Sequence, residues 1–336
     1  MWITKQSNLD LIMNNTTFII NGGAGRVICA IPALEKYAIQ NPQDDFRVIV
    51  HGWESLFWSH PTLQHRTFGA HQKGTFEQHM KHARVVVPEP YHNKRFYNQE
   101  INLIQAFDEE INHTQDHEDI NLNCLHLSQY EIHKAREFIE HQKQEKKKRK
   151  VVVFQPFGSG AEIMDNQVMD KSNRSLHMTD YIKIIQQLQN DCVILYASAP
   201  EFRSTKDNIT TTFDHMQPYH RTLMSMIYHC DLFVGCCSVG QHVARAFDKS
   251  GVIIMGGTSE HNFSYPDHFQ IYRKPNRTPQ YVPWRLSDVD CEFADRANDG
   301  IMKFTDAEVN EIIHMIKQNL SSSTTEQHGD TSLQYD

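Results

Sequence analysis

Short aliphatic runs alternate with helical patterns along almost the entire chain, and this alternation restricts the fold more than any other sequence feature. Several of the runs end in glycine or proline, and most are followed by a segment whose apolar residues recur every three or four positions. Strands that alternate with helices in this way form parallel sheets covered by helices. The predicted strands lie at 16–22, 46–53, 83–90, 151–160, 192–198, 231–237 and 251–257, and the predicted helices at 26–40, 98–112, 128–144, 179–189, 220–230, 241–248 and 305–320.

A dense basic run, KQEKKKRK at 143–150, separates two such arrays of similar size. The length of 336 residues also suggests two domains. We therefore predict an α/β protein with domains at 1–148 and 149–320 and a disordered polar tail at 321–336. We expect two Rossmann-like, doubly wound domains that face each other across a cleft, and we expect the last helix to cross back onto the first domain.

The composition excludes several classes of protein. Hydrophobic residues make up 39% of the chain, yet no run approaches the roughly 20 apolar residues of a membrane span. The formal net charge of −8 argues against sequence-independent wrapping of nucleic acid, while leaving room for a local basic groove. Seven cysteines without a Cys-x-x-Cys pair and 21 histidines without a tight ligand pattern predict no disulfide framework and no metal site. The N-terminus lacks a signal-peptide layout, so we expect a cytoplasmic protein with no integral membrane segment.

The stretch NGGAGRVICAIPAL at 21–34 places a glycine-rich turn between a strand and a helix. Backbone N–H groups and the helix dipole bind anions at such a turn. The third glycine of a dinucleotide fingerprint would fall at Ile28, and the second strand ends at His51 instead of an acidic residue. The turn therefore predicts an anionic ligand at the carboxyl ends of the strands, without indicating a dinucleotide.

Four segments, in order, resemble the bacterial heptosyltransferases of glycosyltransferase family 9. They are GGAGRVICAIPALEKY at 22–37, VVVFQPFGSG at 151–160, NRSLHMTDYIKII at 173–185, and the segment at 230–262 that contains GCCSVGQHVARA. The resemblance covers most of the chain. It implies the GT-B fold, with an N-terminal domain that binds the acceptor and a C-terminal domain that binds a nucleotide-sugar.

The resemblance places the donor diphosphate in the second domain. Arg174 stands at the position of a family lysine, and the turn before the helix at 241–248 offers N–H groups and a hydroxyl. Peptide dipoles and cationic side chains can stabilise a leaving diphosphate in place of a metal ion. We therefore expect metal-independent transfer, with the nucleotide-sugar as co-substrate and no cofactor. The predicted donor-binding residues are Pro156, Gly158, Arg174, Ser238, Val239, Gly240, His242 and, at the ribose, Glu260.

Arg26 departs from the family pattern, in which an aspartate at this position is taken as the base that deprotonates the acceptor. An arginine stays protonated at any working pH and cannot act as that base. Three explanations are open. The base lies elsewhere, at Glu54, His51 or Glu89; the leaving phosphate assists a retaining mechanism; or Arg26 binds a phosphate of an anionic acceptor. The predicted catalytic residues are Glu54, His51 and Arg26, and the predicted acceptor-binding residues are Gly25, Arg26, Trp53, Tyr91 and Arg95.

The resemblance implies a glycosyltransferase, and two kinds of acceptor fit the first domain. One is a saccharide such as lipopolysaccharide core. The other is a hydroxymethylated base in DNA, because phage enzymes that modify such bases share the GT-B plan. For DNA, the basic side would comprise Arg26, His51, Lys73, Lys81, Arg84, Lys94 and Arg95, interleaved with Trp53, Phe57, Trp58, Tyr91, Phe96 and Tyr97. The alternatives are a sugar-nucleotide epimerase and a non-catalytic relative that binds glycan or DNA.

Overall fold

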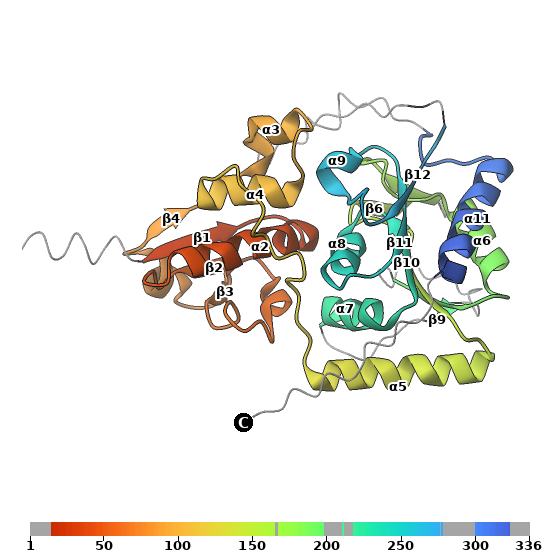
Figure 1. Ribbon diagram of the computed structural model, residues 1–336, viewed down its shortest axis with the longest axis horizontal. Coiled ribbons are helices and arrows are strands. Elements are labelled where there is room, and N and C mark those ends of the chain that lie inside the picture. The colour runs from red at the N-terminus through yellow and green to blue at the C-terminus, as the bar shows by residue number, and fades with distance from the viewer. Residues whose placement is uncertain are drawn as a thin grey trace, which may run out of the picture.

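The computed structural model describes residues 15–164, 167–197, 210–211, 218–275, 277 and 300–322. It contains two parallel sheets, each packed with helices, that lie side by side as two lobes (Figure 1). The predicted α/β class and the two facing domains are confirmed. The predicted tail lies outside the described residues beyond Ser322.

The first lobe is built on a four-stranded parallel sheet in the order β3-β2-β1-β4. Its strands are β1 (Thr16–Ile20), β2 (Arg47–Val50), β3 (Thr67–Gly69) and β4 (Arg84–Val86), and its helices include α2 (Ala24–Gln40), α3 (Lys94–Tyr97) and α4 (Leu103–Asn112), with short turns η1 (Glu54–Phe57), η2 (Phe76–Met80) and η3 (Pro90–His92). The sequence prediction lacked β3, because a three-residue strand is too short to show a period. The turn of interest, at 21–23, joins β1 to α2.

The second lobe is built on a six-stranded parallel sheet in the order β12-β11-β10-β5-β8-β9, with an antiparallel hairpin, β6-β7, beside it. Its strands are β5 (Val151–Gln155), β6 (Ala161–Met164), β7 (Gln167–Asp170), β8 (Val193–Tyr196), β9 (Thr210–Thr211), β10 (Leu232–Cys236), β11 (Gly251–Met255) and β12 (Gln270–Arg273). Its helices are α6 (Met178–Leu188), α7 (Tyr219–His229), α8 (Val239–Ala246), α9 (Glu260–Phe263) and α11 (Asp306–Ser322). Every residue of β5, β10 and β11 is buried, as expected for apolar runs inside a parallel sheet.

Two helices near the predicted domain limits pack on the second lobe. Helix α5 (Gln129–Lys146) has the predicted capping box between Ser128 and Glu131, and it contacts α7 and β8 (Figure 1). The domain limits at 148 and 149 stay a prediction. The last helix, α11, contacts α6 and the β10–β11 part of the sheet, so our expectation that it crosses back onto the first lobe is wrong. Its apolar face, which includes Ile312 and Ile316, is buried in the core of the second lobe.

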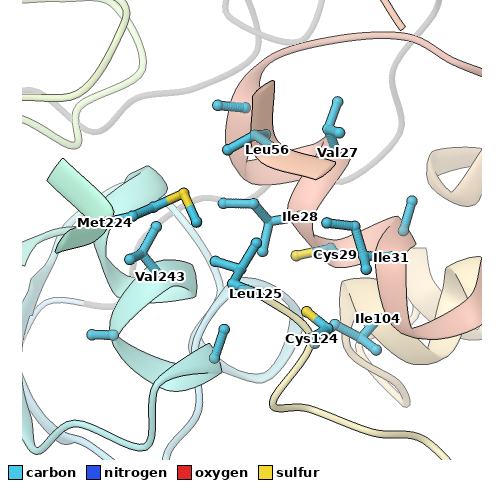
Figure 2. Close-up of a cluster of buried hydrophobic side chains, with 14 of the residues drawn as sticks. Val27, Ile28, Cys29, Ile31, Leu56, Ile104, Cys124, Leu125, Met224 and Val243 are labelled. Atoms are coloured by element: carbon cyan, nitrogen blue, oxygen red, sulfur yellow. The ribbon is translucent and has the colours of Figure 1, made fainter. Parts of the chain in front are cut away.

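An apolar core continues between the two lobes. Figure 2 shows Ile28 of α2 close to Met224 of α7 and Val243 of α8, with Leu125 of the loop before α5 beside them. Polar contacts supplement this packing, since the Asn262 side-chain amide donates to the carbonyl of Phe96 at 2.6 Å. The lobes are therefore held in one arrangement by hydrophobic burial. Among the described helices, none is both long enough and apolar enough to cross a bilayer.

Candidate active site

A cleft of about 510 Å³ lies between the lobes. Its walls come from the start of α2 and the segment after β2 in the first lobe. In the second lobe they come from the loop after β5 and from the starts of α7 and α8. These segments follow the carboxyl ends of parallel strands or begin helices at that edge, which is where α/β sheets bind ligands.

Two helix N-termini meet at the cleft. Helix α2 begins after Gly23 and helix α8 begins after Ser238, and neither of these N-cap residues makes a side-chain capping bond to its helix. The helices approach closely at Gly25, where an added Cβ would lie 2.9 Å from Cδ2 of His242 and 3.4 Å from its Nε2. The positive ends of both helix dipoles therefore point toward one region, which favours an anion there.

The start of α8 is held by Gln155, the last residue of β5. Its Oε1 accepts a hydrogen bond of 2.8 Å from the backbone N–H of Gly240, and its Nε2 donates to Oγ of Ser238 at 3.3 Å. A Cβ on Gly240 would lie 2.5 Å from that Oε1, so this glycine permits close packing. Because its N–H is bonded inside the protein, Gly240 does not present it to a ligand. The sequence analysis missed Gln155, although a polar residue that ends an apolar strand was a usable signal.

Arg174 brings a permanent cation to the second-lobe wall of the cleft. Its Nε donates to Oγ of Ser172 at 2.8 Å, and its Nη1 donates to the carbonyl of Cys237 at 3.3 Å, directly before α8. Asp170 anchors this loop. Burial raises the pKa of the Asp170 carboxyl, but hydrogen bonds from Ser172 and Ser175 outweigh burial and hold this pKa below its ordinary value. The guanidinium is therefore positioned beside the α8 N-terminus.

His242, in the first turns of α8, also lines the cleft. Burial, and then the nearby charge of Arg174, lower the pKa of His242 to about 4, so the ring is neutral at pH 7. Its Nδ1 lies 2.8 Å from the hydroxyl of Tyr265 and 3.4 Å from Sγ of Cys29. Burial raises the pKa of Cys29 to about 12 and that of Tyr265 well above its ordinary value, so both groups keep their protons. Nδ1 is therefore engaged inside the protein, and Nε2 is the ring nitrogen beside Gly25.

The first-lobe wall contains Gly25, Arg26, Trp53 and Tyr91, as predicted for the acceptor side. Arg26 is paired, because its Nη1 and Nη2 lie 3.0 and 3.1 Å from the two carboxylate oxygens of Glu89. Its guanidinium also lies 4.8 Å from the ring centre of Tyr91. Trp53 is fixed by a hydrogen bond of 3.0 Å from Nε1 to the carbonyl of Gly22. The charge of Arg26 is therefore largely compensated before any ligand binds.

The structure does not bring all predicted site residues together. In the described part of the chain, the cleft lining includes Gly158, Arg174, Ser238, Val239 and His242 of the donor set, but not Pro156, Gly240, Glu260, Arg95, Glu54, His51 or Glu89. Glu260 pairs with Arg273 at 2.7 Å, and Arg95 pairs with Glu109. The side chain of Glu54 lies against Gly69, and Nε2 of His51 lies 3.0 Å from Nε2 of His71. The roles assigned to these residues stay predictions that the cleft geometry does not support.

His220, at the start of α7, lines the cleft, although the sequence analysis assigned no residue of this helix to the site. Its Nε2 is hydrogen-bonded to Oγ of Ser55, and its ring centre lies 5.5 Å from that of Trp53. Burial, and then the charge of Arg221, lower the pKa of His220 to about 4. The sequence signal that could have identified His220 was the polar pair His220-Arg221 at the start of this helix.

A second histidine cluster contains Glu35, His60 and His126, whose ligand atoms lie within 4.8 Å of one another. Nδ1 of His60 accepts backbone N–H groups from Thr62 and Leu63 at 3.2 and 3.1 Å. The proton of the neutral ring is therefore on Nε2, which lies 3.0 Å from the carboxylate of Glu35. A protonated nitrogen has no lone pair for a metal ion. The His60–Glu35 contact is therefore a hydrogen bond, and in this arrangement the Nε2 of His60 is not a metal ligand.

The replacement Gly25→Ala is expected to weaken nucleotide-sugar binding by about tenfold, because the new methyl group would displace the His242 ring at a cost of about 1.4 kcal/mol. Titration calorimetry with the wild type and the variant measures this change. Gly23→Ala is the matched control, since a Cβ there meets nothing within 4 Å. Equal losses in the two variants would show that the displacement of His242 is not the cause.

No protein-family model matches this sequence, and no curated protein matches it either. Solved structures do match the fold. A glycosyl transferase family 9 protein from Veillonella parvula superposes with a TM-score of 0.63 at 10% identity, over 92% of this chain and 97% of that one. The iron-containing dodecameric glycosyltransferase TibC of enterotoxigenic E. coli superposes with a TM-score of 0.56 at 13% identity, over 92% of this chain and 79% of TibC. The E. coli heptosyltransferase WaaC, solved with ADP, superposes with a TM-score of 0.53 at 12% identity, over 91% of this chain and 99% of WaaC. The chain therefore has the GT-B fold of the family 9 glycosyltransferases, as the sequence resemblance implied.

Proposed function

We propose that this protein is a glycosyltransferase that moves a sugar from a nucleotide-sugar to an acceptor hydroxyl. The observation that carries the proposal is the convergence of Arg174, His242 and two helix N-termini on one cleft between the lobes. In sugar transfer the bond from C1 to the diphosphate breaks, and negative charge grows on the departing oxygens. Preorganised N–H donors and a fixed cation stabilise that charge.

We propose that the second lobe binds the donor. Gly158, Arg174, Ser238, Val239 and His242 lie on its side of the cleft, and among them the Arg174 guanidinium and the Ser238 hydroxyl are donors that suit a diphosphate. Two proteins with this fold support the choice, since WaaC was solved with ADP and TibC with ADP-D-β-D-heptose. ADP-heptose is therefore the first donor to test. Because the cation and the peptide dipoles come from the chain itself, we propose a metal-independent reaction, in which the rate is unchanged by EDTA.

We propose a saccharide as the acceptor. A DNA acceptor requires free cations, and three of the predicted ones are already paired: Arg26 with Glu89, Lys81 with Glu77 at 2.7 Å, and Arg95 with Glu109. Trp53 remains on the first-lobe wall, where an aromatic face suits a sugar ring. The charge pattern thus favours a saccharide over a hydroxymethylated DNA base.

The proposal is tested by incubating the protein with ADP-heptose and other nucleotide-sugars, each with lipopolysaccharide core oligosaccharide, with hydroxymethylcytosine DNA, or alone. We expect nucleoside diphosphate release that depends on the saccharide. Release without any acceptor would indicate hydrolysis, and interconversion of the donor would indicate an epimerase. Failure of every nucleotide-sugar to bind would refute the assignment of the cleft.

A further inference from the structure

Glycosyl transfer, the proposed function on which this inference rests, requires a group that accepts one proton. The acceptor hydroxyl must lose its proton as its oxygen attacks C1 of the sugar. Yet the described residues that line the cleft include no aspartate and no glutamate. Their other ionisable groups are guanidinium ions, phenols and a thiol, which are proton donors, and two histidines, His220 and His242. The base therefore comes from one of these two rings, or the cleft contains none.

His242 does not suit this role. Its Nδ1 lies 2.8 Å from the Tyr265 hydroxyl and 3.4 Å from the Cys29 thiol. The opposite edge of the ring, with Cδ2 and Nε2, packs against Gly25, and the residue is 7% exposed. Both ring nitrogens are therefore packed against protein groups and are not open to an acceptor hydroxyl.

His220 has the opposite arrangement. Its Nε2 is hydrogen-bonded to Oγ of Ser55, a residue of η1 that is 5% exposed and lies in the first lobe. Its ring packs edge-on against Trp53, which is itself tied to Gly22. Nε2 is thus engaged outside the cleft, and Nδ1 is the nitrogen left for a ligand. The contacts with Ser55 and Trp53 hold the ring, which belongs to the second lobe, against the acceptor side.

We propose that His220 is the general base of this protein. With its Nε2–H donated to Ser55, Nδ1 accepts the proton of the acceptor hydroxyl. The oxygen of that hydroxyl forms the new bond to C1, the bond from C1 to the diphosphate breaks, and its electron pair leaves with the nucleoside diphosphate. The imidazolium then returns its proton to water. The position of the family's aspartate is occupied by Arg26, so the base is supplied by the other lobe.

The electrostatic surroundings of His220 are compatible with this role. Burial, and then the charge of Arg221, lower its pKa to about 4, which is in the range of an ordinary carboxylate. Of the charged groups on the elements packed against it, Arg221 is paired with Glu131 of α5, and Glu54 of η1 lies against Gly69. His220 is therefore neutral at pH 7, with a basicity similar to that of the aspartate it replaces.

The test is the replacement His220→Gln, assayed with a saturating nucleotide-sugar and saccharide acceptor. We expect kcat to fall about 100- to 10,000-fold, the usual contribution of general base catalysis, while the KM for the donor stays unchanged. Wild-type kcat should decline as pH falls through about 4, where His220 becomes imidazolium, and the residual rate of the variant should lack this decline. In His220→Ala, added imidazole should restore turnover, which a merely structural role would not permit.

The matched control is His229→Gln on the same helix, where Nε2 contacts the carbonyl of Ile132 outside the described cleft lining. Full kcat in His220→Gln, or a change confined to the donor KM, would overturn the assignment. If Glu54→Gln lost kcat while His220→Gln stayed active, the general base would be Glu54 and not His220. A wild-type protein with no acceptor-dependent transfer would refute the proposed function itself, whereas an active wild type with an unaffected His220→Gln would refute only the base.

Discussion

Replacement of Arg174 with alanine is expected to weaken binding of a nucleotide-sugar by about 10- to 100-fold, the usual range for a hydrogen bond between charged groups. Arg174 is the cation on the second-lobe wall, and its contacts with Ser172 and the Cys237 carbonyl aim it at the start of α8. Titration calorimetry with ADP and ADP-heptose measures the loss. Both ligands should be affected alike, because the diphosphate is common to them.

Two further variants separate charge from geometry at this position. Arg174→Lys keeps the charge but loses the planar fork, so we expect a smaller loss than in Arg174→Ala. Lys171→Ala removes an exposed cation from the same loop, outside the described lining, and should leave binding near the wild-type value. Equal affinity in Arg174→Ala and the wild type would remove Arg174 from the donor site.

Replacement of Arg221 with methionine is expected to lower the free energy of unfolding by about 3–5 kcal/mol, the range for a buried ion pair that loses one partner. The Arg221 side chain is 2% exposed, and its Nε and Nη2 donate to the Glu131 carboxylate at 2.7 and 2.6 Å. Its Nη1 donates to the carbonyl of Ser55 at 3.2 Å, so one guanidinium joins α7, α5 and η1. Urea denaturation at pH 7 measures the change.

The exposed pair between Lys81 and Glu77 is the control for this prediction. Lys81→Ala should cost less than about 1 kcal/mol, because solvent screens a surface ion pair. The double replacement Arg221→Met with Glu131→Gln should recover much of the stability lost in the single variant, since neither charge is then left buried alone and the glutamine can keep the α5 capping box with Ser128. If Arg221→Met lowered the free energy of unfolding as little as Lys81→Ala does, the contacts of Arg221 with α5 and η1 would not stabilise the fold as we expect.

Arg174, Ser238 and His242 were chosen from the resemblance to family 9, and the structure places all three on the cleft lining, while their roles in donor binding stay predictions. Gly25, Arg26, Trp53 and Tyr91, which were predicted to bind the acceptor, also line the cleft, on its first-lobe wall. Glu54 and His51 also follow a strand, but η1 and the loop at 69–71 give them other neighbours.

The sequence by itself determined the alternation of the longer strands and helices, the α/β class and the capping box of α5, because each depends on residues a few positions apart. It did not show the short strands β3, β6, β7, β9 and β12. Only the tertiary structure decided which polar groups share the cleft. Arg26 meets Glu89 across 63 positions, and His220 meets Ser55 across 165. The first pair depends on how α2 and the loop after β4 pack within the first lobe, and the second on how the two lobes pack. Both arrangements are set by the summed burial of apolar surfaces, which no local spacing encodes.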